Sequence, residues 1–151
     1  MFVYVKYEES LNFSEREGGS YGSWSESYDS TVTSVGVLKD GEDQPYDSEN
    51  FQVADGSTKI YVVYMIYSTG NSFGNADGKI SIIHAFSNSA AAHALAKEIT
   101  ENPGQDTFNY KDDLGKDQRY WNVGSGYFER ISYVEVLPFD LENQPRRYRV
   151  N

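Results

Sequence analysis

Two histidines are the side chains of this sequence that ordinarily titrate near neutral pH, and their positions favour packing over catalysis. His84 lies in an apolar stretch that alternates like a strand, on one predicted face with Ile80, Ile82 and Phe86. A histidine among apolar neighbours is more often a hydrogen-bonded core residue than a catalyst. His93 falls on the polar side of a predicted helix, where we expect a solvated side chain. Neither histidine predicts an acid–base centre.

Other catalytic and metal-binding patterns are missing from the sequence. Serines are numerous, but no G-x-S-x-G turn presents one as a nucleophile, and no H-E-x-x-H or paired-histidine spacing supplies zinc ligands. The chain has no cysteine, so it forms neither disulfides nor thiolate sites. Asp40, Glu42, Asp43 and Asp47 lack the D-x-D-x-D-G spacing and closing glutamate of a calcium loop, so we expect a solvated acidic loop there. The sequence thus predicts a non-enzymatic protein without metal or cofactor.

A polar, glycine-rich segment from Ser68 to Gly78 separates two apolar stretches. Its hydroxyls, amides and backbone N–H groups could form a concave anion-binding surface for a phosphorylated or nucleotide ligand. The residues of this possible ligand loop are Ser68, Thr69, Gly70, Asn71, Ser72, Phe73 and Gly74. It is not a Walker loop, because no Gly-Lys-Ser/Thr ending at a helix N-terminus is present. The alternative is a long hairpin connection whose glycines permit positive φ, and both interpretations stay open.

The net charge of −10 is unevenly distributed along the chain. Residues 1–59 carry 12 acidic and 4 basic side chains, whereas residues 60–151 carry 11 and 9. Direct binding to DNA or RNA needs clustered lysine and arginine, so this balance argues against it and favours a basic protein partner. Aromatic side chains, which are enriched at interfaces, lie among these acids, although ordinary sheet packing also uses them. The predicted partner-binding residues are Trp24, Tyr28, Glu42, Asp43, Tyr46, Asp47 and Glu49.

The framework that must position these residues is clearest between residues 60 and 100. The stretch 60–67 is apolar on both faces, as expected of a central strand, and 80–86 is predicted as its neighbour. A helix is predicted over 88–101, with Asn88 or Ser89 as its N-cap. Further predicted strands cover residues 2–9, 23–28, 31–38, 51–54, 107–110 and 127–137, the first three as an antiparallel meander. Residues 39–50 and 111–126 are predicted as exposed loops, the second anchored by Trp121.

Length and pattern together predict a single domain, residues 1–151, of the α+β class. We expect a mainly antiparallel, twisted sheet of five to seven strands with one principal helix, about 88–101, packed on it. The N-terminus lacks the basic start and apolar run of a signal peptide, and no segment approaches the roughly 20 apolar residues of a membrane span. We therefore expect a soluble, cytoplasmic protein that does not contact membranes.

The segment Y-S-T-G-N-S-F-G, followed by a strand and an alanine-rich helix, resembles a motif of small uncharacterised proteins from bacteriophages and prokaryotes. The resemblance covers roughly residues 61–99 and implies a hairpin-plus-helix core and a phage-like origin, but no activity. With the acidic N-terminal part, it leads to the hypothesis of a phage accessory factor or anti-defence inhibitor, such as an anti-CRISPR protein. This factor would mimic nucleic acid at a basic site of a host protein. The alternative is a protein that sequesters a small molecule or nucleotide with the loop from Ser68 to Gly78.

Overall fold

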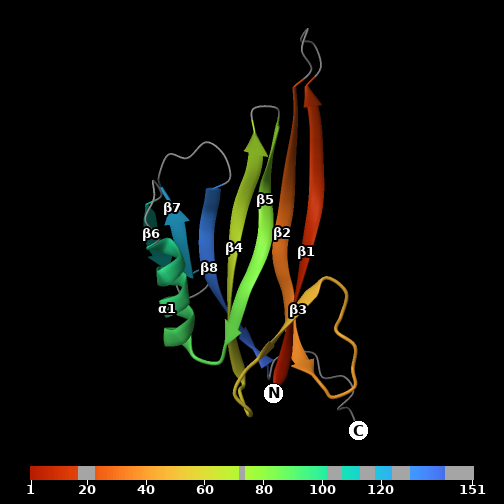
Figure 1. The fold of residues 1–151 in the computed structure, drawn as a ribbon, viewed down its shortest axis with the longest axis vertical. Coiled ribbons are helices and arrows are strands. Elements are labelled where there is room, and N and C mark those ends of the chain that lie inside the picture. Colours follow the sequence, from red (N-terminus) through yellow and green to blue (C-terminus); the bar gives the residue numbers. More distant parts are fainter. Residues whose placement is uncertain (17–22, 72–73, 102–106, 113–117, 124–129, 142–151) are drawn as a thin grey trace.

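The computed structural model describes residues 1–16, 23–71, 74–101, 107–112, 118–123 and 130–141. Eight strands and one helix follow one another in these residues (Figure 1). They are β1 (Phe2–Arg16), β2 (Ser23–Leu38), β3 (Ser48–Gln52), β4 (Lys59–Asn71), β5 (Gly74–Phe86), α1 (Ser89–Thr100), β6 (Phe108–Asp112), β7 (Gln118–Asn122) and β8 (Arg130–Asp140). The predicted α+β class is confirmed, and the described strands exceed the expected five to seven by at least one.

The strands are hydrogen-bonded in the order β3-β1-β2-β5-β4-β8-β7-β6. All neighbours are antiparallel except β2 and β5, which run parallel and pair only through Glu26 with Ala76 and Ser27 with Asp77. The sheet therefore has two antiparallel parts, one of three strands and one of five, joined by this two-residue pairing, which we call the seam (Figure 1).

Gly78 lets the two parts approach closely just beyond the seam. Its φ is +87°, and a Cβ atom built on it would lie 2.1 Å from the backbone oxygen of Tyr28 in β2. Only glycine fits both constraints, because it has no Cβ and adopts positive φ readily. Ser30 strengthens the contact, since its hydroxyl donates a hydrogen bond to the Gly78 carbonyl at 2.6 Å. The junction is therefore narrow and depends on one glycine.

β4 is the centre of the fold, as its apolar pattern predicts. It pairs with β5 on one side and β8 on the other, and both of its faces are buried. Val62 points into a core shared with β1, β2 and β5, whereas Val63 points into a second core beneath α1. Ala92 and Ala96 bring α1 onto that second core.

The predicted helix is confirmed. α1 begins after Asn88, whose side chain accepts a hydrogen bond from the Ala91 N–H at 3.1 Å.

Among the described residues, no helix reaches the length and apolar character that crossing a membrane requires.

Three predicted elements are wrong. Residues 23–28 and 31–38 form one strand, β2, and β1 runs seven residues beyond its predicted end at Glu9. The polar residues of β1 and β2 pair with each other, and a hairpin ladder is built by backbone hydrogen bonds rather than by apolar side chains. The predicted meander is replaced by the order β3-β1-β2. The predicted loop 111–126 contains β7, which pairs with β6 and β8 and buries Tyr120 beneath α1.

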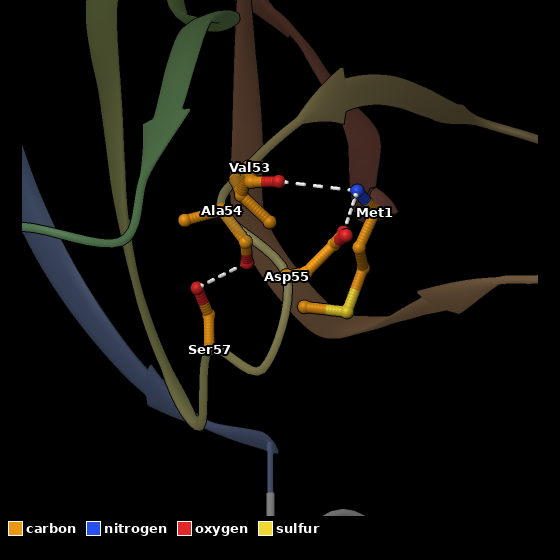
Figure 2. Close-up of polar contacts among 5 residues, drawn as sticks. All are labelled: Met1, Val53, Ala54, Asp55 and Ser57. Atoms are coloured by element: carbon orange, nitrogen blue, oxygen red, sulfur yellow. Dashed lines mark hydrogen bonds and ion pairs between the residues drawn. The ribbon is translucent and has the colours of Figure 1, made fainter.

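The start of β1 is fastened to the turn that follows β3 (Figure 2). The Met1 ammonium group donates hydrogen bonds to the Val53 carbonyl at 3.2 Å and to Asp55 Oδ1 at 2.6 Å. This hydrogen bond and the positive charge lower the pKa of the Asp55 carboxyl. The Ser57 hydroxyl closes the turn by donating to the Ala54 carbonyl at 2.6 Å. These contacts fix β3 as the outer strand beside β1.

Candidate functional site

The residues predicted to bind a partner lie in two separate places. Five of them, Glu42, Asp43, Tyr46, Asp47 and Glu49, lie in β3 or in the connection that leads to it. Trp24 and Tyr28 lie in β2, far from the end of that strand at Leu38. Because a strand rises about 3.3 Å per residue, Tyr28 lies roughly 33 Å along β2 from the start of that connection. From there the connection turns back along β1, where the Asp47 carbonyl is bonded to Tyr7, which pairs with Val32 of β2. A single surface formed by all seven residues stays a prediction.

We call the first group, Glu42, Asp43, Tyr46, Asp47 and Glu49, the acidic edge. All five side chains are exposed, and Tyr46 is 86% exposed. None of the four carboxylates forms an ion pair with a described residue. The segment is nevertheless held in place, because the Tyr7 N–H donates to the Asp47 carbonyl at 3.0 Å. A fixed, negatively charged surface with one protruding aromatic ring results.

The negative charge of the acidic edge affects the pKa of Tyr7 in β1. Burial raises the pKa of its hydroxyl, and the charges of Glu49, Asp47 and Glu9 raise that pKa further. Desolvation next to the sheet likewise raises the pKa of the Glu49 carboxyl.

Phe2, at the start of β1, is an exposed apolar side chain that the sequence did not single out. It is 48% exposed and pairs with Leu38 of β2 and Gln52 of β3, the two strands between which the acidic connection runs.

Tyr28 and Trp24 lie in β2, outside the acidic edge. The ring of Tyr28 is half-buried near the seam, and the Lys79 ammonium lies 4.8 Å from its centroid. This cation–π contact occupies one face of the ring. Trp24 pairs with Glu15 in the β1–β2 hairpin, and its side chain lies outside the described part of the structure.

The possible ligand loop is mostly strand. β4 and β5 extend through it, pairing Thr69 with Ala76, Gly70 with Asn75 and Asn71 with Gly74, while Ser72 and Phe73 lie outside the described residues. The Ser68 hydroxyl is buried and donates to the Arg130 carbonyl at 3.4 Å. This arrangement supports the hairpin interpretation, because the pairing directs the backbone into the sheet rather than around a ligand.

His84 packs among aromatic rings. Its ring centroid lies 5.2 Å from that of Phe51 and 4.7 Å from that of Phe86, both edge-on, and it makes no hydrogen bond to a described residue. The packing role is supported, but the predicted common face is wrong. Ile82 belongs to the first core and Phe86 packs on the second, because an irregularity in the β4–β5 register leaves Ile83 without an opposite residue.

His93 is not the solvated residue that the sequence predicted. Its Nδ1 atom lies 2.7 Å from the Tyr120 hydroxyl, and its Nε2 atom lies 2.8 Å from Gln118 Oε1. The β6–β7 hairpin supplies these partners and covers the side of α1 that we expected to face solvent. His93, Lys97, Tyr110 and Tyr120 line an open pocket of about 470 Å³, which we call the histidine pocket.

Glu135 is the second position that sequence reasoning missed. It lies in β8 with 1% of its surface exposed, and Arg119 Nε of β7 lies 3.2 Å from its Oε1 atom. Neither carboxylate oxygen has a hydrogen-bond partner among the described residues. Desolvation raises the pKa of this carboxyl to about 7.

Arg119 is held in front of Glu135 by aromatic rings, with its guanidinium carbon 4.3 Å from the Tyr133 centroid and 5.3 Å from the Trp121 centroid. The sequence does contain a feature that indicates the buried position of Glu135, because this charged residue lies between Tyr133 and Leu137 on an otherwise apolar strand face.

Within the described ranges, no three histidine, aspartate or glutamate side chains come together as possible metal ligands. The similarity of residues 61–99 to phage and prokaryotic proteins stays a prediction. No family model, no curated protein and no solved structure matches this chain.

Proposed function

We propose that this protein is a non-enzymatic binding protein whose acidic edge occupies a basic, nucleic-acid-binding surface of a host protein in the cytoplasm. The observation that carries the proposal is the 86% exposed ring of Tyr46 in one short segment with four exposed carboxylates that no described cation neutralises.

Electrostatic interactions favour the acidic edge bound to a basic partner over the acidic edge exposed to solvent. Like charges held together repel each other and lower the stability of the fold, and exposed carboxylates return little stability of their own. A lysine- and arginine-rich surface turns that repulsion into attraction and accelerates association. Charge on an edge strand also prevents strands of two copies from pairing, which is the simplest alternative role. That role does not account for Tyr46, because an exposed tyrosine favours contact rather than avoiding it.

The alternative function, binding of a small molecule or nucleotide by the segment from Ser68 to Gly78, has less support. The described part of that segment is paired within the β4–β5 hairpin, and its Ser68 hydroxyl is already bonded.

The test begins with affinity capture from a bacterial lysate, followed by measurement of the association rate with the captured protein. Between about 50 and 300 mM salt the Debye length falls from roughly 14 to 6 Å. The association rate of a complex steered by charge should therefore fall with salt, whereas that of a complex formed by apolar contacts should not. We expect the association rate to fall by about tenfold or more across this range.

Two matched variants locate the effect. Glu42→Lys with Asp43→Lys changes the charge of the acidic edge by four units, and Glu98→Lys with Glu101→Lys makes the same change at exposed positions of α1 and its C-cap. Only the first variant should slow association, and Tyr46→Ser should accelerate dissociation. A captured partner that binds both charge variants equally, at every salt concentration, contradicts the proposal.

A further inference from the structure

The histidine pocket is a concave site, separate from the acidic edge, between α1 and the β6–β7 hairpin. His93 and Lys97 come from successive turns of α1, so their side chains lie on one face of the helix. Tyr110 comes from β6 and Tyr120 from β7, where the two residues pair directly. Its volume of about 470 Å³ falls in the range of pockets that hold small molecules, roughly 300 to 1,000 Å³.

Hydrogen bonds fix the floor of this pocket. The Gln118 amide oxygen can only accept, so the His93 Nε2–H donates to it, and the His93 Nδ1 atom shares a second hydrogen bond with the Tyr120 hydroxyl. Burial and the neighbouring Tyr110 raise the pKa of Tyr120, which keeps its proton available for that bond. Both imidazole nitrogens are therefore occupied, and the ring serves as a rigid surface rather than as a proton acceptor for a substrate.

The walls of the pocket are aromatic. Tyr110 is 48% exposed, its ring centroid lies 4.8 Å from that of Tyr120, and it meets the His93 ring edge-on at 5.7 Å. Three rings held in contact with one another, one of them half open to solvent, form a surface on which a further flat ring can stack.

Lys97 is the one cationic side chain among the described residues that line the pocket. Its side chain is exposed and forms no ion pair with a described residue, so its three N–H donors are available to an anion. A singly charged anion suits this site better than a doubly charged one. Among the described lining residues, only the Lys97 ammonium group can compensate the charge of a ligand. A second negative charge would also be repelled by Asp112, whose charge acts on Tyr110, and by the net charge of −10 of the chain.

We infer that the histidine pocket binds a planar aromatic molecule that carries one carboxylate. The ring stacks against Tyr110 over the floor formed by His93 and Tyr120, and the carboxylate accepts hydrogen bonds from the Lys97 ammonium.

The histidine side chains give a direct readout of this binding. The chain contains two histidines, so an NMR spectrum of the imidazole groups shows two sets of signals. Titration with indole-3-acetate should shift the His93 signals saturably and leave those of His84 unchanged, because His84 lies outside the pocket between Phe51 and Phe86. Indole, which lacks the carboxylate, should bind about fivefold more weakly, the amount expected for one partly exposed ion pair.

Variants separate the two parts of the recognition. Lys97→Gln should lower the affinity for indole-3-acetate to that for indole, whereas Lys97→Arg should retain it. Lys111→Gln is the matched control, since Lys111 is also exposed and lies next to Tyr110 but does not line the pocket. Tyr110→Leu should weaken both ligands.

Three outcomes overturn the inference: no His93 shift at millimolar ligand, equal affinity of Lys97→Gln and wild type for indole-3-acetate, or tighter binding of AMP, whose phosphate is doubly charged. The result is independent of the acidic edge. The variant Glu42→Lys with Asp43→Lys should titrate like wild type, so failure of one proposal leaves the other intact.

Discussion

Replacing Gly78 by alanine should open the seam between the two parts of the sheet. The added methyl group would stand 2.1 Å from the Tyr28 carbonyl oxygen, so β2 and β5 must separate by about 1 Å or more before ordinary contact is restored. Separation also breaks the hydrogen bond from Ser30 to the Gly78 carbonyl. Few other backbone hydrogen bonds resist this separation, because in the described part of the chain only two residue pairs join β2 and β5.

Three effects set the size of the loss. Alanine at φ +87° costs about 1–2 kcal/mol relative to glycine, overpacking typically costs 1–3 kcal/mol, and a lost hydrogen bond about 1 kcal/mol. We therefore expect Gly78→Ala to lower the free energy of unfolding by about 3 to 6 kcal/mol, a large part of the roughly 5–15 kcal/mol that holds a domain folded.

Gly56→Ala is the matched control. Gly56 has nearly the same φ, +79°, but nothing lies within 4 Å of the point that a Cβ atom would occupy there, so this substitution costs only the backbone term of about 1–2 kcal/mol. Urea unfolding monitored by circular dichroism gives both values, and Ser30→Ala supplies a milder change at the seam, about 1 kcal/mol, should Gly78→Ala not fold. Equal losses for Gly78→Ala and Gly56→Ala would refute the argument that backbone approach at the seam excludes a side chain.

Two further predictions concern Glu135 and His84. The folded-state pKa of Glu135, about 7, lies above its ordinary 4.5, so the wild type should lose stability as pH rises through this window, by at most about 3.4 kcal/mol, with the attraction of Arg119 reducing the loss. Glu135→Gln should remove that part of the pH dependence, whereas the control Glu98→Gln, at an exposed position, should not. Urea unfolding at pH 5 and pH 8 measures this. If the free energy of unfolding changes by the same amount between these pH values in wild type and Glu135→Gln, the prediction is wrong. His84→Ala should cost about 1–3 kcal/mol through the loss of two ring contacts, whereas His84→Phe should keep them and retain stability. A melting temperature for His84→Phe as low as that for His84→Ala would show that the imidazole has a polar role.

The elements that could be predicted are those whose pattern is local. The doubly apolar run of β4 and the capped, alanine-rich α1 carry their own signals, and both appear within a few residues of their predicted bounds. The outer half of β1 could not be predicted in this way, because Ser10 and Asn12 are held in the sheet by the backbone of β2 and show no apolar period. β7 was hidden for a related reason, since Tyr120 is the one residue of that strand that is fully buried.

The tertiary contacts of a side chain are harder to predict from the sequence than the helix or strand to which the side chain belongs. A helical pattern places His93 on the polar side of α1 correctly, yet it contains no information that a hairpin some 25 residues later covers that side. Likewise, Trp24 lies in β2 and Tyr46 in the connection before β3, and the sequence does not contain the strand order that separates them. Glu135 is the exception, since its position in an apolar strand was visible in the sequence.

The strand order has a consequence for the synthesis of the chain. β4 can pair with β5 as soon as their hairpin has left the ribosome. Its other partner, β8, begins roughly 45 residues after β5 ends, a delay of about 2 to 9 s at ordinary elongation rates. During that time one edge of the most apolar strand is uncovered, and such an edge can pair with a neighbouring nascent chain. Conditions that slow translation between β5 and β8 should therefore favour aggregation, even of a sequence whose finished fold is stable.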